Sequence, residues 1–82
     1  MYLHIGGSVM IRTRDLIGIF DMDNSSTSFL TRDFLRRAEE NKRIVNISDD
    51  LPKSFVLCEN KVYLSQLSSA TLLKRIESSS LL

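Results

Sequence analysis

The sequence predicts a small α+β domain, in which an antiparallel β-sheet carries one central helix and one C-terminal helix. Three observations lead to this class. Apolar side chains alternate with a period of two over residues 2–14 and 54–65, a four-residue apolar repeat follows residue 28, and a hydroxyl-rich step at 68–69 leads into a second helical pattern. A chain of 82 residues makes one domain. We expect residues 1–77 to form it and residues 78–82 to be a flexible tail.

The first strands are predicted on either side of a tight turn at Gly6-Gly7, where glycine supplies the backbone freedom. The alternation continues through residues 9–14, so it places Arg12 and Arg14 on one face of one strand and Asp15 on the opposite face. The next run, LIGIF at residues 16–20, is apolar on both sides. It predicts an inner strand, or a strand whose second face meets another subunit. Gly18 within it indicates a bulge or a close backbone approach.

The central helix is expected after a polar turn at residues 21–27 and to end near Asn41, a residue that tolerates the left-handed conformation. Its N-cap is predicted among Ser26, Thr27 and Ser28. Leu30, Phe34 and Ala38 recur every four residues, with Phe29 and Leu35 beside them, so this stripe is expected to be buried. Asp33–Arg37 and Arg36–Glu40 are pairs of opposite charge four residues apart, which stabilise a helix.

The second half predicts a short strand at residues 44–47, a turn at 49–52, and a hairpin closed by Glu59-Asn60. In the hairpin, the side chains expected to face the core are Phe55, Leu57, Val62 and Leu64. Ser68 or Ser69 is the expected cap of the last helix, whose predicted apolar face consists of Leu72, Leu73 and Ile76.

The residue types that usually carry catalysis or metals are scarce. One cysteine and one histidine cannot form an intramolecular disulfide or a tetrahedral Cys/His zinc site within one subunit. We expect Cys58 to be a buried, unreactive thiol and His4 to be a packing or surface residue. Asp21, Asp23 and Asn24 are interpreted as turn formers. We therefore expect no enzyme activity and no cofactor.

The charge balance limits the partners that can be expected. Eleven basic and ten acidic side chains give a net charge of +1, so a nucleic-acid surface requires uneven placement of the basic residues. The alternative is a solvated surface balanced by nearby acids. A chain this short buries only ~60% of the surface that its unfolded form exposes, which favours self-association. No apolar stretch approaches the ~20 residues that span a bilayer, so we expect a cytoplasmic protein without membrane contact.

Four segments, MYLHIG, RTRDLIGIFD, PKSFVL and VYLSQLSSATLLKRI, lie in an order and spacing that resembles the RemA/RemB family of extracellular matrix regulators. The resemblance covers residues 1 to about 77. It implies a small β-rich fold with a long helix and a ring-shaped homo-oligomer. It also implies activation of biofilm matrix genes by binding of double-stranded DNA around the ring, with a related regulator protein as the other candidate partner.

The resemblance also points to particular residues. In RemA-like members, one arginine directly before the strand equivalent to residues 16–20 and an arginine pair before the hairpin are associated with DNA. Here these positions fall on Asp15 and near Asp50-Leu51. The predicted DNA-binding residues of this chain are therefore the adjacent cations Arg12, Arg14 and Lys53. Two hypotheses remain: a DNA-associated transcriptional regulator, and an oligomeric scaffold that binds a partner protein without touching DNA.

Overall fold

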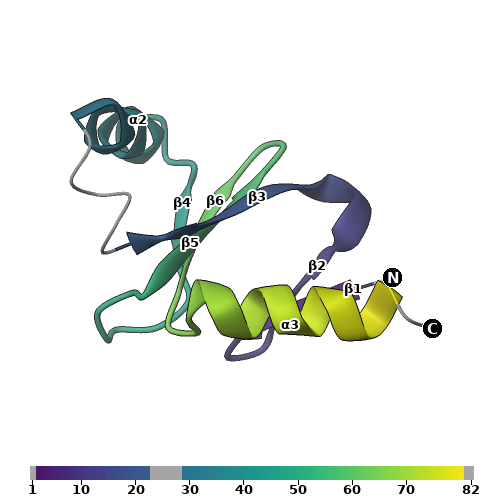
Figure 1. Cartoon of the computed structure of the whole chain (residues 1–82). Helices are drawn as coiled ribbons and strands as arrows, with labels where there is room; N and C mark the ends of the chain where they lie inside the picture. The colour runs from purple at the N-terminus through teal and green to yellow at the C-terminus, as the bar shows by residue number, and fades with distance from the viewer. Residues whose placement is uncertain (1, 23–28, 81–82) are drawn as a thin grey trace.

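The computed structural model, which describes residues 2–22 and 29–80, has three layers (Figure 1). The elements in chain order are β1 (Tyr2–Gly6), β2 (Val9–Arg12), the 3-10 turn η1 (Thr13–Asp15), β3 (Leu16–Asp21), α2 (Phe29–Glu40), β4 (Ile44–Asn46), β5 (Ser54–Cys58), β6 (Val62–Ser65) and α3 (Ser69–Ser80). The predicted α+β class with a central and a C-terminal helix is confirmed. α3 continues to Ser80, into the segment for which a flexible tail is expected.

The strands form two sheets. β1 and β2 make an antiparallel pair, and the second sheet has the order β3-β5-β6-β4. In this sheet β4 runs parallel to β6, so the prediction of a purely antiparallel sheet is wrong. After β4 the chain forms β5, which leaves the position next to β4 open. β6 then returns from the hairpin and fills that position between β4 and β5. The hairpin itself, with β5 antiparallel to β6, is confirmed.

Two glycine positions have the backbone roles predicted for them. Gly6 and Gly7 adopt positive φ angles of 126° and 53° at the turn between β1 and β2. At Gly18 the register of β3 against β5 shifts. A Cβ atom there would lie 2.8 Å from the Phe20 ring, so a side chain at this bulge would clash.

β3 occupies an edge of its sheet. The alternative of an inner strand is therefore wrong, and the side chain of Ile17 is 64% exposed. The other alternative, that a second subunit covers this strand, agrees with that exposure. An edge strand with exposed apolar side chains is a surface to which another chain can be added.

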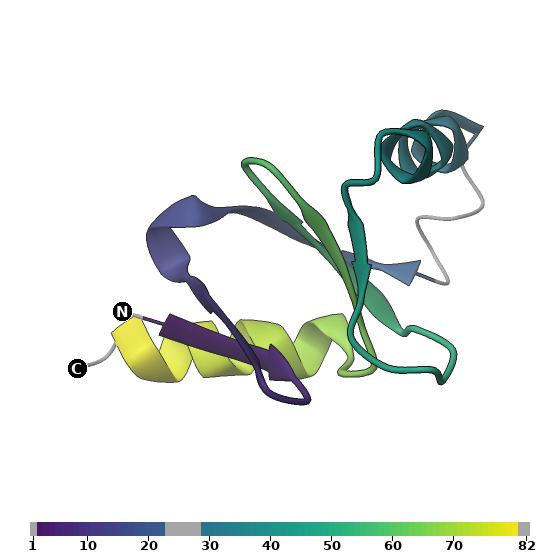
Figure 2. The ribbon, with the colours of Figure 1, turned by 180° about the vertical axis from the view of Figure 1, so that it is seen from behind.

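A hydrophobic core lies on each face of the four-stranded sheet. On one face, β1, β2 and α3 enclose the cluster of Leu3, Ile5, Ile11, Val56, Cys58 and Leu72. On the other face, α2 covers Phe55 and Val62 with Ala38. Figure 2 shows α2 on one side of the sheet and the β1–β2 pair with α3 on the other. β5 is therefore buried on both faces, and the expected alternation of buried and exposed side chains fails there.

The helices keep only part of the burial that their patterns predict. In α2, Leu35 and Ala38 pack on the sheet, but Leu30 is 76% and Phe34 is 41% exposed. Expecting the whole stripe to be buried was wrong, since the contact of α2 with the sheet buries Ala38 and part of Leu35 and leaves surface of Leu30 and Phe34 exposed. In α3 the buried residue is Leu72, whereas Leu73 is 49% exposed, so Leu73 does not belong to the apolar face.

The helix ends show familiar capping geometry. At the end of α2, the N–H groups of Lys42 and Arg43 donate to the carbonyl oxygens of Glu39 and Ala38, the Schellman pattern. Its left-handed residue is Lys42, with φ of 59°, one position after the predicted Asn41. At the start of α3, Ser68 Oγ accepts from the Thr71 N–H at 3.1 Å, which confirms Ser68 as the cap. The predicted N-caps of α2 lie outside the described residues, as do Asp23 and Asn24.

Candidate nucleic-acid interface

Arg12 and Arg14 do not share a strand face. Arg12 is the last residue of β2, and Arg14 lies in the 3-10 turn η1. Because this turn brings residues three apart to the same side, Arg12 Nε lies 3.5 Å from Asp15 Oδ2. The expectation that Asp15 faces away from the arginines is therefore wrong. The spacing of two alternate strand positions does not describe this pair.

Arg14 is the more available of the two guanidinium groups. It is exposed and forms no ion pair with any of the described residues. A shallow hollow of about 260 Å³ is lined by Tyr2, Arg12, Thr13 and Arg14. Arg12 is partly neutralised by Asp15, so its side chain is less available to an external anion.

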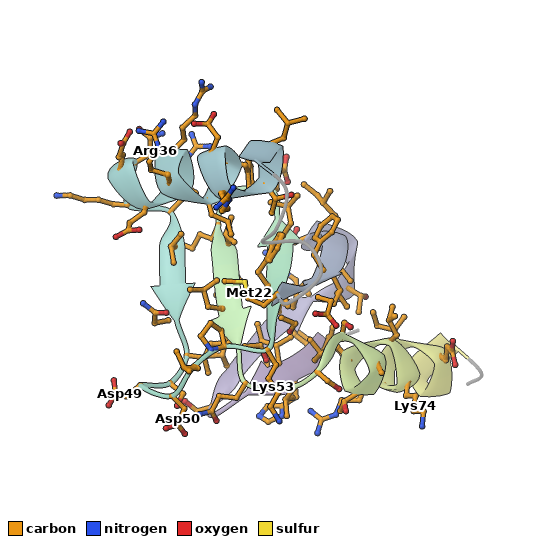
Figure 3. The ribbon with its side chains drawn as sticks, turned by 60° about the vertical axis from the view of Figure 1, so that its left-hand side comes forward. Met22, Arg36, Asp49, Asp50, Lys53 and Lys74 are labelled. Atoms are coloured by element: carbon orange, nitrogen blue, oxygen red, sulfur yellow. The ribbon has the colours of Figure 1, made fainter. Side chains whose placement is uncertain are left out.

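Lys53 lies at the opposite end of the sheet. Its carbonyl oxygen accepts from the Met22 N–H at 2.9 Å, next to the end of β3. Arg14 precedes the start of β3, so the five residue steps of this strand, at about 3.4 Å each, separate the backbones of the two residues by about 17 Å. Figure 3 shows Lys53 beside Asp49 and Asp50, at the end of the sheet away from α2. One subunit does not bring the three predicted DNA-binding residues together.

Other cations do gather near Arg14, because three strand ends meet there. The Val62 N–H donates to the Arg43 carbonyl at 2.9 Å, which places the segments before β4 and β6 side by side. We call this region the cationic end; it carries Arg12, Arg14, Lys42, Arg43 and Lys61 with two carboxylates, Asp15 and Glu59. A cleft of about 440 Å³ connects its parts, with Arg12 and Lys61 in its wall. Sequence reasoning missed this grouping, which requires the parallel pairing of β4 with β6.

The opposite end of the sheet is acidic. Among the described residues it carries Asp21, Asp49 and Asp50 against the single cation Lys53. The loop before β5 is fixed in place, since Gln66 Nε2 donates to Ser48 Oγ at 2.6 Å and to Asp50 Oδ2 at 2.5 Å. Carboxylates thus stand where the resemblance predicts an arginine pair.

The arginines of α2 are largely balanced within the helix. Arg36 contacts Asp33 at 2.7 Å and Glu40 at 3.2 Å, and Arg37 Nε lies 3.1 Å from Asp33. Both predicted i,i+4 pairs are confirmed. The hydrogen bond from Arg36 lowers the pKa of Asp33 below its ordinary value. The interpretation as a solvated, self-balanced surface therefore holds for this helix face.

His4 and Cys58 have the structural roles expected of them. His4 Nε2 lies 2.7 Å from the Gly7 carbonyl oxygen, and Arg75 Nη1 lies 3.1 Å from His4 Nδ1. A neutral ring with its hydrogen on Nε2 satisfies both contacts. Cys58 is buried; burial, and secondly the charge of Asp15, raise the pKa of its thiol, which disfavours the reactive thiolate.

Neither a metal centre nor a membrane span is found in the part of the chain that the structure describes. No group of three His, Cys, Asp or Glu side chains there could hold a metal ion. No described helix is both long and apolar enough to cross a bilayer.

Comparison with known proteins gives two matches that agree. A family described as RemA-like, extracellular matrix regulatory protein A-like, matches residues 2–76. The chain is 36% identical over 77 residues to extracellular matrix regulatory protein B of Bacillus subtilis (strain 168). That alignment covers 94% of this chain and 91% of the relative.

Proposed function

Because this chain belongs to the RemA-like family of extracellular matrix regulatory proteins, we propose that it is a cytoplasmic, DNA-associated transcriptional regulator of extracellular matrix and biofilm genes. In this proposal it acts as a ring-shaped homo-oligomer and not as an enzyme. The relative bears the name of a regulatory protein, which supports the regulatory role. The distribution of charge in the chain supports the contact with DNA.

The observation that carries the proposal is the cationic end. In a chain with a net charge of only +1, five cations and two carboxylates occupy one end of the sheet. Among these five, Arg12 is paired with Asp15, whereas Arg14, Lys42, Arg43 and Lys61 are exposed and form no ion pair with any described residue. These four are therefore available to phosphates, Arg14 and Lys61 among them. Such contacts give affinity for the DNA backbone without selecting a sequence.

Self-association supports the same proposal in two ways. The exposed apolar side chains of Ile17, Leu30 and Phe34 form a surface of the kind that another subunit covers. A ring would also repeat the cationic end in every subunit, so that several weak phosphate contacts act together on one DNA.

A DNA shift assay over a series of salt concentrations tests the proposal. The double variant Arg14→Ala, Lys61→Ala should bind more weakly to every duplex. The slope of log affinity against log salt should flatten by about 0.9 for each phosphate contact that the whole oligomer loses. Lys53→Ala should do less, because Lys53 stands alone among carboxylates, and Lys74→Ala on α3 serves as the matched control. Wild-type binding by the double variant would overturn this assignment of the DNA surface.

A second function is favoured by the acidic end. Asp49 and Asp50 repel phosphates at the position where the resemblance predicts arginines, while the apolar surface of α2 stays uncovered. Both features suit an oligomeric scaffold that binds a partner protein. Absence of salt-dependent DNA binding by the oligomer would select this function over the first.

A further inference from the structure

A small apolar groove lies between α2 and the start of β3. Its walls include Ile17 from β3, Phe34 and Ala38 from α2, and Leu57 from β5, around a volume of about 200 Å³. Ile17 and Phe34 are 64% and 41% exposed, although both are large hydrophobic residues. Three cations, Arg37, Arg43 and Lys61, and one carboxylate, Glu59, also line it. Arg37 is paired with Asp33, so Arg43 and Lys61 supply the positive charge.

The size and the charge of this groove indicate what it can hold. Pockets for small organic ligands measure about 300–1,000 Å³, so this groove is below their range. An apolar floor whose lining carries more cations than carboxylates is complementary to an apolar side chain that has carboxylates beside it. Such a group is presented by a protein segment.

This chain exposes a segment of that kind in the loop between β4 and β5. Leu51 is 89% exposed, the highest value among the large hydrophobic side chains of the described residues. The two residues before it are the exposed carboxylates Asp49 and Asp50. We call Asp49–Leu51 the acidic knob. The bonds from Gln66 to Asp50 and Ser48 hold this loop in place, so little ordering cost remains when the knob docks.

The knob cannot reach the groove of its own subunit. The knob follows the end of β4, whereas Arg43 at the groove rim precedes the start of the same strand. Figure 3 shows Asp49 and Asp50 at one end of the sheet and α2 at the other. A contact between them therefore requires two copies of the chain, each using one knob and one groove.

We propose that the acidic knob of one subunit docks into the apolar groove beside α2 of the next, an inference that rests on the oligomer proposed above. Leu51 covers Ile17 and Phe34 of the next subunit. The carboxylates of Asp49 and Asp50 approach its Arg43. Because the two surfaces are different, the contact is head-to-tail and repeats until a ring closes. Arg12, at the end of β2, and Arg14, in η1, do not line the groove and stay available to DNA. Lys61 lines both the groove and the cleft beside Arg12.

The test measures mass in solution by light scattering, with circular dichroism to check folding. Wild type should form a species several times heavier than the 9.4 kDa subunit. Leu51→Asp should give a folded monomer, because a carboxylate replaces the side chain that enters the apolar groove. Arg43→Glu should do the same by repelling Asp49 and Asp50. Leu73→Asp, which changes an exposed leucine on α3, is the matched control and should keep the wild-type mass.

Mixing the two monomeric variants separates this contact from a general loss of association. Leu51→Asp keeps an intact groove and Arg43→Glu keeps an intact knob, so together they should form a dimer and nothing larger. If Leu51→Asp keeps the wild-type mass, or if the mixture stays monomeric, the docking is wrong while the proposed oligomeric regulator stands. If wild type itself is a 9.4 kDa monomer, the ring is refuted together with the docking, and the shift assay then judges DNA binding alone.

Discussion

The two helices of this subunit have similar apolar patterns but differ in how far their apolar side chains are buried. α3 places Leu72 in the core with no exposed surface, and Ile76 packs beside it. α2 also has an apolar stripe, yet Leu30 is 76% and Phe34 is 41% exposed. The apolar side chains of α3 are therefore covered within the subunit, whereas part of the apolar stripe of α2 stays exposed, although Phe55 and Val62 beneath that helix are buried. The comparison teaches that the subunit is stabilised mainly on the α3 side and is open to association on the α2 side.

The largest expected effect on stability concerns the α3 side of the sheet. Leu72→Ala should lower the free energy of unfolding by about 2–5 kcal/mol, because it leaves a cavity in the core beneath α3. Its neighbour Leu73, 49% exposed, is the control, and Leu73→Ala should change stability by no more than about 0.5 kcal/mol. Urea denaturation of both variants decides the matter. Equal midpoints for the two would mean that α3 is not docked as described.

A second prediction concerns the joint between the two sheets. Ser65 is fully buried; its hydroxyl donates to the Ile5 carbonyl at 2.6 Å and accepts from the Leu67 N–H at 3.0 Å. Ser65→Ala removes this partner from both backbone groups, which should cost about 1–3 kcal/mol. The control is Ser8→Ala, in the exposed turn between β1 and β2. A Ser65→Ala protein as stable in urea as wild type would show that the two hydrogen bonds of Ser65 do not stabilise the contact between the sheets.

Sequence reasoning recovered the elements better than their surroundings. The periods of two and of about four residues located β1, the hairpin and both helices, because each pattern arises from local backbone geometry. The patterns could not show that part of the apolar stripe of α2 stays exposed or that β5 is covered on both faces. Those facts depend on the strand order, in which β6 returns between β4 and β5.

The same limit explains the result for the candidate site. The alternation predicted Arg14 on a strand, but Arg14 lies in the 3-10 turn η1. The ion pair of Arg12 with Asp15 depends on the same three-residue turn. Lys53 was grouped with the arginines by resemblance, although β3 separates them. Arg43 and Lys61 meet only through the parallel pairing of β4 with β6. Charged side chains can be listed from a sequence, but the topology decides which of them lie together.

A substitution on the α2 side should have a much smaller effect on stability. Leu30→Gln replaces an exposed leucine with another good helix former, so the free energy of unfolding should change by no more than about 0.5 kcal/mol in dilute protein. Chemical denaturation measures it beside Leu72→Ala. A loss of about 2 kcal/mol or more would mean that Leu30 is covered, and the contrast between the helices would fail.

The smallest effect concerns the ion pairs that support α2 on its exposed side. The hydrogen bond from Arg36 is the main cause that lowers the pKa of Asp33 from its ordinary value of 3.8 in the folded protein; burial opposes it, and the charges of Arg37 and Arg36 add to it. A carboxyl group with a lowered folded-state pKa stabilises the fold above its unfolded pKa and loses this contribution as the pH falls through the folded value.

The stability of wild type relative to Asp33→Asn should therefore be constant near neutral pH and should shrink below pH 3.8. Arg36→Gln should remove most of that pH dependence, since it removes the main cause. Urea unfolding at several pH values measures both variants, and a wild-type advantage that grows on acidification would contradict the role given to Asp33. Because these side chains lie at the surface, added salt should reduce the difference further, whereas the loss in Leu72→Ala, which comes from packing, should persist.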